Sequence, residues 1–304
     1  MISSFLIKTT LCGHLYTNLN KFPKLYLHAY PFYLANILKK KYYILGHTIG
    51  PFFGPLKYTS RNLTRKLIKK ATLTTLRDKN SFEEIDRLGL NNISTINASK
   101  ETVFLYPLVK AKPSQLSGRK IKKHIAITIH HTYFKYWYSK EEYIKLMAQV
   151  VDEIHKGLPD YKINFFSMEK DRAEGDDKNV ITEIINNCEH KELVCMKSFS
   201  DNPIYTIEAI NDYDCMIATK THSVVYGLIN CIPTFSISYQ EKSNDFMKDF
   251  GLREYTNNLK ELNPTYVASK VFKLIENKKN ISNQISEKLA TFQNIIRNDI
   301  KLLK

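Results

Sequence analysis

The chain has 304 residues, of which 43% are hydrophobic and 12% aromatic, so a disordered chain is excluded and two domains of ordinary size are expected. Five cysteines, an odd number without regular spacing, exclude a disulfide framework and favour a reducing compartment. The formal net charge of +15 lies in the first part of the chain: residues 1–123 carry 22 Lys or Arg against 5 Asp or Glu, whereas residues 124–304 carry 23 against 25.

The sequence shows no apolar run long enough to cross a bilayer. Lys8 interrupts the short apolar start, so no signal peptide is expected and the predicted location is the cytoplasm. The basic first part has three interpretations: peripheral contact with the inner face of an anionic membrane, binding of nucleic acid, or a Lys-rich surface without a partner. No known nucleic-acid-binding module is visible, so no nucleic-acid partner is expected.

The first part of the chain shows an incomplete alternation of strands and helices. Strands are expected at 42–46, 73–76 and 102–105, and helices at 56–70 and 81–88. Ser81 and Glu84 have the spacing of a capping box, and Gly89 would end that helix. Residues 110–123 are polar and basic and contain Pro113 and Gly118, which predicts a linker.

The second part alternates regularly between strands and helices. Strands are expected at 124–129, 161–166, 193–196, 214–219 and 234–238, and helices at 139–155, 178–187, 203–210, 222–230 and 244–250. This alternation predicts a parallel, doubly wound sheet. The expected organisation is an N-terminal Rossmann-like domain at 1–115, a second one at 120–279, and a long amphipathic helix at 280–304.

Cationic residues and a histidine follow three of the predicted strands. Arg77 follows the strand at 73–76, Lys220 and His222 follow 214–219, and Lys242 follows 234–238. Ligands of parallel sheets bind beyond the carboxyl ends of the strands. We therefore expect the last three side chains to meet, with Arg77 facing them from the other domain across a cleft. Such a site suits a small anionic ligand with phosphate or carboxylate groups, although each residue taken alone is also compatible with a structural ion pair or a solvated surface.

Three other groups of residues are weaker candidates. Cys188, His190 and Cys195 lack the spacing of a zinc site, and no metal is expected. His130 and His131 follow a strand end and are candidates for a ligand contact in the cleft, but they lack partners for a metal site. We expect an acidic cluster to form a solvated loop; the cluster consists of Asp171, Glu174, Asp176 and Asp177.

Two blocks of sequence resemble the polysaccharide pyruvyl transferases. The first combines Gly46-His-Thr-Ile-Gly-Pro-Phe52 with Leu76-Arg-Asp-Lys-Asn-Ser81. The second, more specific block begins with Met216-Ile-Ala-Thr-Lys-Thr-His-Ser223 and continues through Ile232-Pro-Thr-Phe-Ser-Ile-Ser-Tyr239 to Lys242. The similarity runs from about residue 10 to about residue 255.

The resemblance implies a fold like the GT-B glycosyltransferases, with two Rossmann-like domains. It also implies transfer of the carboxyvinyl unit of phosphoenolpyruvate to sugar hydroxyls of a cell-surface polysaccharide or its lipid-linked precursor, without a cofactor. The arginine, histidine and lysine that family members use fall on Arg77, His222 and Lys242. Substrate contacts are expected from Lys220 and from its neighbours along the two strand ends, which are Thr221, Ser223 and Tyr239.

This chain departs from the family pattern at two places. Lys220 stands where an arginine is usual, and lysine cannot form a bidentate fork. The usual opening strand with its Gly-Asn-x-Gly-Asp type loop is missing, so the N-terminal domain is expected to be incomplete. Two alternatives stay open: a GT-B glycosyltransferase that uses a nucleotide sugar, and an inactive remnant of either enzyme.

Overall fold

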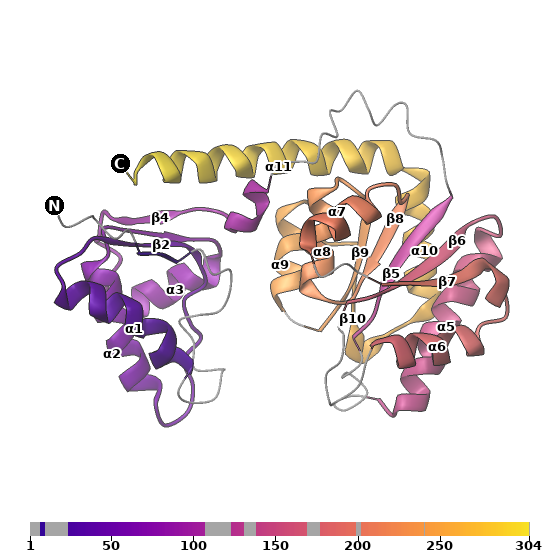
Figure 1. The fold of residues 1–304 in the computed structure, drawn as a ribbon, viewed down its shortest axis with the longest axis horizontal. Coiled ribbons are helices and arrows are strands. Elements are labelled where there is room, and N and C mark those ends of the chain that lie inside the picture. Colours follow the sequence, from indigo (N-terminus) through magenta and orange to yellow (C-terminus); the bar gives the residue numbers. More distant parts are fainter. Residues whose placement is uncertain are drawn as a thin grey trace. The chain divides into compact units, whose positions relative to one another are not determined.

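The computed structural model describes residues 7–9, 24–106, 123–130, 138–168, 177–198, 202–239 and 241–303. The chain divides into two compact units: unit 1 comprises Met1–Tyr106 and Ala290–Lys304, and unit 2 comprises Pro107–Leu289. Each unit is built on a parallel sheet (Figure 1), which confirms the α/β class. None of the described helices is long and apolar enough to span a membrane. The predicted linker at 110–123 lies outside the described residues except for Lys123.

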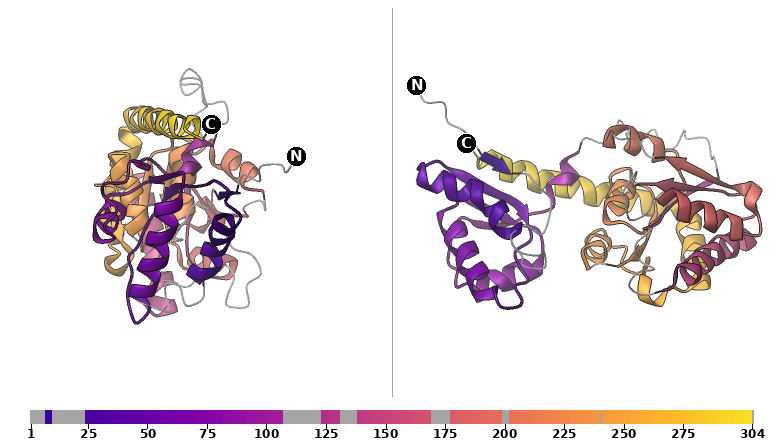
Figure 2. Two further views of the ribbon diagram at one scale, coloured as in Figure 1. Left: turned by 90° about the vertical axis from the view of Figure 1, so that its left-hand side faces the viewer. Right: turned by 60° about the horizontal axis from the view of Figure 1, so that its bottom comes forward.

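Unit 1 contains a four-stranded sheet in the order β1-β2-β3-β4. Its elements are β1 (Ile7–Thr9), α1 (Lys24–Ile37), β2 (Tyr42–His47), α2 (Lys57–Lys70), β3 (Leu73–Leu76), α3 (Lys79–Arg87) and β4 (Ile96–Ala98). Right-handed crossovers along a strand order that never reverses leave every connecting helix on the same side. Accordingly, α1, α2 and α3 all cover one face of this sheet (Figures 1 and 2).

The side chains of β2 alternate between two cores, as the period of a strand requires. Tyr42 and Ile44 pack with the helices in the main core of unit 1. Tyr43 and Leu45 point to the opposite face, where Leu303 packs against them. That residue follows α11 (Lys278–Lys301), whose C-terminal part belongs to unit 1. The last helix of the chain therefore supplies a second layer to the first sheet.

Two local predictions in unit 1 are wrong. The stretch expected as a strand at 102–105 is the 3-10 helix η1 (Thr102–Leu105), because the real fourth strand is β4, a few residues earlier. Asp78, not Ser81, caps α3: its carboxylate accepts the backbone N–H of Ser81 at 2.8 Å. Gly89 ends this helix with φ of +65°, as predicted. Helix α1 was not predicted, because Pro31 lies inside it.

Unit 2 contains a six-stranded parallel sheet in the order β10-β9-β8-β5-β6-β7, which confirms the predicted double winding. Its strands are β5 (His124–Thr128), β6 (Lys162–Ser167), β7 (Val194–Ser198), β8 (Cys215–Ala218), β9 (Thr234–Ser238) and β10 (Thr256–Asn258). Its helices are α5 (Lys140–Gly157), α6 (Asp177–Asn187), α7 (Pro203–Ile210), α8 (Thr221–Ile229), α9 (Glu241–Asp249) and α10 (Pro264–Glu276), with α11 beginning in this unit. Short 3-10 helices are η3 (Lys191–Leu193) and η4 (Leu259–Glu261).

Local signals in unit 2 agree closely with the structure. Ser139 and Glu142 form the predicted capping box at the start of α5. The bounds predicted for α7 and β9 are those observed. Strand β10 and helix α10 were not predicted. Since β5, β6, β8 and β9 carry buried side chains at nearly every position, the sheet is covered on both faces, as a parallel sheet requires.

Candidate active site

The strand order of unit 2 changes direction between β5 and β8. These strands are neighbours, although β6 and β7 lie between them in the sequence. A crevice suited to a ligand forms beyond the carboxyl ends of the strands at such a switch point. Thr128, at the end of β5, joins the two strands there: its carbonyl accepts the hydroxyl of Thr219 at 2.6 Å, and its hydroxyl accepts the Thr219 N–H at 3.1 Å. The backbone at the switch point is thereby fixed.

Lys220, just beyond the end of β8, forms a buried ion pair. It is the N-cap residue of α8, and its Nζ donates to Oδ2 of Asp177 at 2.7 Å. The same oxygen accepts the backbone N–H of Met168 at 3.0 Å, just beyond β6. Asp177 is fully buried at the start of α6, so its prediction as part of a solvated loop is wrong. A buried ammonium needs a buried anion beside it, and Asp177 provides that anion.

His222 is the second residue of α8, and its side chain is exposed. Partial desolvation lowers the pKa of His222 below its ordinary value of 6.5, and the positive charges of Lys242 and Lys220 lower this pKa further. The neutral imidazole therefore prevails near neutral pH. The positive end of the α8 dipole and the nearby ammonium groups favour an anion at the same place.

Residues from the ends of β9 and β5 complete this edge of the sheet. Lys242 lies in the first turn of α9, where its Nζ is 5.5 Å from the centre of the Phe246 ring. Tyr239 directly follows β9, and its ring lies 5.6 Å from the ring of His130, which follows β5. Side chains from three adjacent strand ends, those of β5, β8 and β9, therefore lie around the switch point.

The two hydroxyl groups beside His222 take part in bonds that position α8. Thr221 Oγ1 lies 2.9 Å from Ser243 Oγ of α9. Ser223 is fully buried and donates to the Lys220 carbonyl at 2.6 Å. A Cβ on Gly227 would lie 2.2 Å from Thr234 Oγ1, so glycine permits the close packing of α8 on β9. Contact of Thr221 or Ser223 with a substrate stays a prediction.

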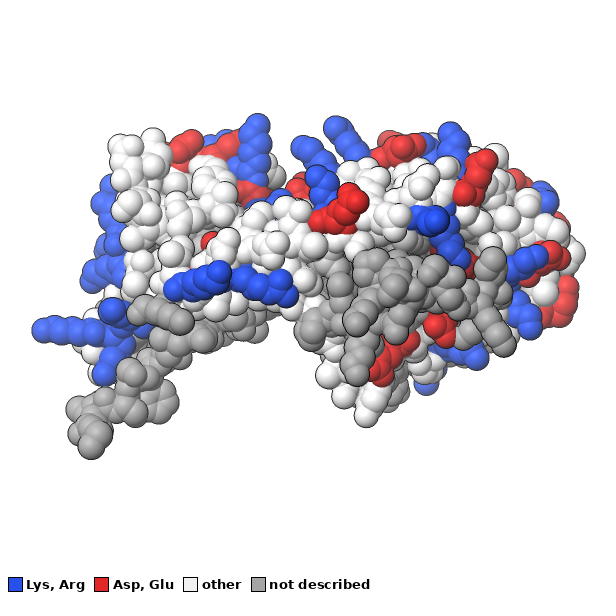
Figure 3. All heavy atoms as spheres, turned by 90° about the horizontal axis from the view of Figure 1, so that it is seen from above, with Lys and Arg blue, Asp and Glu red and all other residues white. Residues whose placement is uncertain are grey.

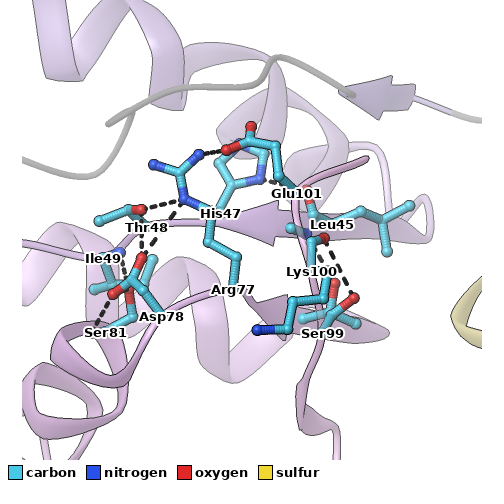
Figure 4. A network of polar contacts seen from close by, with 12 residues as sticks. Leu45, His47, Thr48, Ile49, Arg77, Asp78, Ser81, Ser99, Lys100 and Glu101 are labelled. Atoms are coloured by element: carbon cyan, nitrogen blue, oxygen red, sulfur yellow. Dashed lines mark hydrogen bonds and ion pairs between the residues drawn. The ribbon is translucent and has the colours of Figure 1, made fainter. Parts of the chain in front are cut away.

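Arg77 lies at the carboxyl edge of the sheet in unit 1, in a dense polar network (Figure 4). The side chain is buried, and one terminal nitrogen forms an ion pair with Glu101. Its Nε donates to Thr48 Oγ1 at 2.6 Å and lies 3.6 Å from Asp78 Oδ2. Thr48 in turn donates to Asp78 at 2.5 Å. The positive charge of Arg77 is thus balanced by two carboxylates of its own unit.

His47 adds a second titratable group to the network around Arg77. It ends β2, is fully buried, and its Nδ1 lies 2.8 Å from the Leu45 carbonyl (Figure 4). Burial lowers the pKa of His47 from 6.5 to about 4, and the charge of Arg77 contributes to the decrease, while the Leu45 carbonyl opposes it. His47 is therefore neutral at physiological pH. The predicted approach of Arg77 to His222 joins different units and stays a prediction.

Three important neighbours of the candidate residues were not identified from sequence. Asp177 and Glu101 were missed because each pairs with a cation from a different strand connection. His47 lies in the motif Gly46-His-Thr-Ile-Gly-Pro-Phe52, and its sequence position indicated no role for it. Within the described ranges, no three His, Cys, Asp or Glu side chains are grouped as ligands of a metal ion would be.

Comparison with known proteins places this arrangement in a family. Residues 13–241 match the family described as polysaccharide pyruvyl transferase, which covers most of the chain. The chain belongs to this family. The matched region includes the connections that carry Arg77, His222 and Lys220, and it ends one residue before Lys242.

A curated relative agrees with the family assignment. The amylovoran biosynthesis protein AmsJ of Erwinia amylovora is 23% identical over 269 residues, which cover 83% of this chain. The chain spans 62% of the length of that relative.

Solved structures show where the fold belongs. UDP-GlcNAc 2-epimerase from Neisseria meningitidis has a TM-score of 0.60 at 13% identity and covers 90% of this chain and 71% of its own. The enzyme of the same name from Methanocaldococcus jannaschii also has a TM-score of 0.60 at 13% identity, with 90% and 74% covered. These likenesses show a GT-B-like fold and carry no statement about the substrate.

Proposed function

We propose that this chain is a transferase that moves the carboxyvinyl unit of phosphoenolpyruvate to sugar hydroxyls of a polysaccharide or its lipid-linked precursor. The family and the amylovoran relative support a polysaccharide as the acceptor. The observation that carries the choice of donor is the position of Lys242, Lys220 and His222 around the N-terminus of α8 at the switch point of unit 2. No cofactor enters this scheme.

The charges at this site suit phosphoenolpyruvate. The donor carries a phosphate and a carboxylate, and both groups require cations or N–H donors where water is excluded. Lys220 is already paired with Asp177, so Lys242 and the first turn of α8 are the groups that we assign to the donor's charge. Their fixed positive potential would also stabilise the charge that develops on the departing phosphate.

His222 is proposed as the group that transfers protons. Ketal formation delivers one proton to the methylene carbon of the donor, forms two bonds from sugar oxygens to the neighbouring carbon, and breaks the bond from that carbon to the phosphate oxygen. Both sugar hydroxyls lose their protons, and inorganic phosphate leaves. A histidine whose pKa lies somewhat below 6.5 can accept and return a proton at neutral pH.

Calorimetric titration with phosphoenolpyruvate tests the donor without knowledge of the acceptor. We expect saturable binding that Lys242→Ala weakens roughly tenfold or more, as loss of a charge-assisted contact does. Lys248→Ala is the matched control, because Lys248 is an exposed lysine of the same helix. Binding of UDP-glucose but not of phosphoenolpyruvate by the folded protein would instead favour the nucleotide-sugar glycosyltransferase.

A second measurement separates binding from proton transfer. His222→Ala is expected to abolish phosphate release in the presence of a crude polysaccharide acceptor, while the circular dichroism spectrum and donor binding are retained. His190→Ala is the control, since His190 is an exposed histidine of unit 2 outside the switch point. Turnover of His222→Ala at the rate of the natural protein would contradict the role given to His222.

A further inference from the structure

Helix α1 carries apolar side chains on the side that faces away from its sheet. We call these residues the outer stripe: Leu27, Tyr30, Leu34, Ile37 and Leu38, which are between 37% and 66% exposed. Leu27, Tyr30, Leu34 and Ile37 follow one another at spacings of three or four residues, which places them along one line of the helix, and Leu38 directly follows its end. Such a continuous exposed apolar surface is uncommon on a soluble domain and indicates an interaction site.

The outer stripe is distinct from the face of α1 that packs in the core of unit 1. The core face of α1 consists of Leu25, Ala29, Phe32 and Ala35, all buried. The two sets occupy opposite sides of the helix, so α1 is apolar on two sides. A helix of this kind is normally buried all round. Among the described residues of unit 1, the core packs against only one of its two apolar sides (Figures 1 and 2).

The charge around the outer stripe has a single sign. Residues 24–76 contain ten Lys or Arg and no Asp or Glu. Lys39 and Lys41 follow α1, and Lys69 and Lys70 end the neighbouring α2; all four are exposed. Since they precede β2 and β3 of a parallel sheet, these lysines share its amino edge, opposite the edge that holds Arg77.

The surface of unit 2 differs in this respect. On the face drawn in Figure 3, acidic and basic side chains are interspersed over unit 2. Its sequence from 124 onward has almost equal numbers of the two signs. The positive surface around α1 and α2 therefore belongs to one part of the protein and is not a general property of the chain.

We infer that the outer stripe of α1 and the lysines beside it form a docking surface for an anionic lipid bilayer. Apolar side chains would enter the boundary between head groups and acyl chains, and Tyr30 suits the interface through its polar hydroxyl. The lysines would lie against the anionic head groups. A second copy of the chain is a poorer partner, because a symmetric contact would bring the same cations together.

Vesicle flotation of the full chain tests this surface. We expect binding to vesicles of equal parts phosphatidylglycerol and phosphatidylcholine, no binding to phosphatidylcholine alone, and weaker binding as salt is raised. Replacing Lys69→Gln and Lys70→Gln together should lower the partition coefficient at least roughly tenfold. The matched control is Lys279→Gln with Lys288→Gln, two exposed lysines of α11 in unit 2.

A further pair of variants tests the contribution of the apolar side chains to vesicle binding. Leu27→Ser with Tyr30→Ser should abolish flotation while leaving the circular dichroism spectrum unchanged. The control is Ile204→Ser with Tyr205→Ser, which removes an exposed aliphatic side chain and an exposed tyrosine from α7 of unit 2. Absence of flotation with anionic vesicles, or equal flotation with neutral ones, would overturn the proposal. So would a dimer in solution that the Leu27 and Tyr30 changes convert to a monomer.

Discussion

Lys220 and Asp177 form a buried ion pair with 2.7 Å between Nζ and Oδ2, although 43 residues separate them in the sequence. The pair joins the cap of α8 to the first turn of α6, on opposite sides of the switch point of the sheet. The cation at the site is therefore part of the scaffold of unit 2 as well as a candidate contact for an anion.

Removing the anion of this pair should destabilise unit 2 strongly. Asp177→Ala leaves the ammonium of Lys220 buried without its counter-ion, and we expect a loss of about 3–5 kcal/mol in the free energy of unfolding, measured by urea denaturation. The matched control is Asp160→Ala, because Asp160 forms an exposed pair with Lys123 at the same distance of 2.7 Å. Exposed pairs contribute little, so this control should unfold almost as the natural protein does. Equal effects of the two changes would contradict the structural role of Asp177.

Donor binding should be accompanied by proton uptake at His222. In the free protein the pKa of His222 lies below 6.5 because of desolvation and the positive charges of Lys242 and Lys220. A bound anion favours the imidazolium and raises that pKa, so protons are taken up near neutral pH. Titration with phosphoenolpyruvate in buffers of different ionisation enthalpy measures this uptake. His222→Gln should remove it and His190→Gln should not; proton release, or uptake that persists in His222→Gln, would exclude His222 as the coupled group.

The rate is expected to depend on pH through the same histidine. If neutral His222 accepts the sugar proton, kcat/KM should fall as pH decreases through the lowered pKa of the free protein, below 6.5. The rate profile of phosphate release checks this expectation. A decrease centred above 6.5 would assign the titration to another group.

Loss of Arg77 should lower the stability of unit 1 as well as the affinity for any ligand that Arg77 binds. Arg77→Ala leaves Glu101 buried without its cation, and a loss of about 3–5 kcal/mol is expected. The double change Arg77→Met with Glu101→Leu should recover much of that loss, since it removes both charges. Urea denaturation measures both variants.

Glu101→Gln serves as the control for donor binding by Arg77, because it disturbs the same network but keeps the guanidinium. A role of Arg77 in binding the donor requires that Arg77→Ala weakens the affinity for phosphoenolpyruvate more than Glu101→Gln does. Equal weakening by both variants would show that the network, not a contact from Arg77, determines the affinity.

Unit 1 should lose stability in mild acid because of His47. The folded pKa of about 4 lies below the ordinary value of 6.5, so the unfolded state binds more protons between these values. The stabilisation is complete above pH 6.5 and disappears as pH falls to about 4, a change of roughly 3 kcal/mol. Urea denaturation across this range measures it. His47→Gln should reduce the pH dependence; a pH dependence that His47→Gln leaves unchanged would exclude His47 as its source.

Features that depend on residues close together in the chain were predictable from the amino-acid sequence. The capping box of Ser139 and Glu142, the left-handed glycine at Gly89 and the bounds of β9 all follow from residues a few positions apart. The regular alternation after residue 124 predicted a parallel sheet, and that prediction placed Lys220, His222 and Lys242 beyond adjacent strand ends. The predictable part of the candidate site is therefore its line of cations along one edge.

Which side chains neutralise these cations, and which faces the core covers, depends on the packing of elements that are distant in the sequence. Asp177 reaches Lys220 because β5 and β8 become neighbours at the reversal of the strand order, and Glu101 reaches Arg77 through a strand that the sequence did not reveal. Likewise, helix α1 was not predicted because it contains Pro31. The structure was needed to show which of its two apolar sides packs against the sheet. The physical reason is common to all three: the energy of a buried charge or an apolar surface depends on what packs against it, and that partner is distant in sequence.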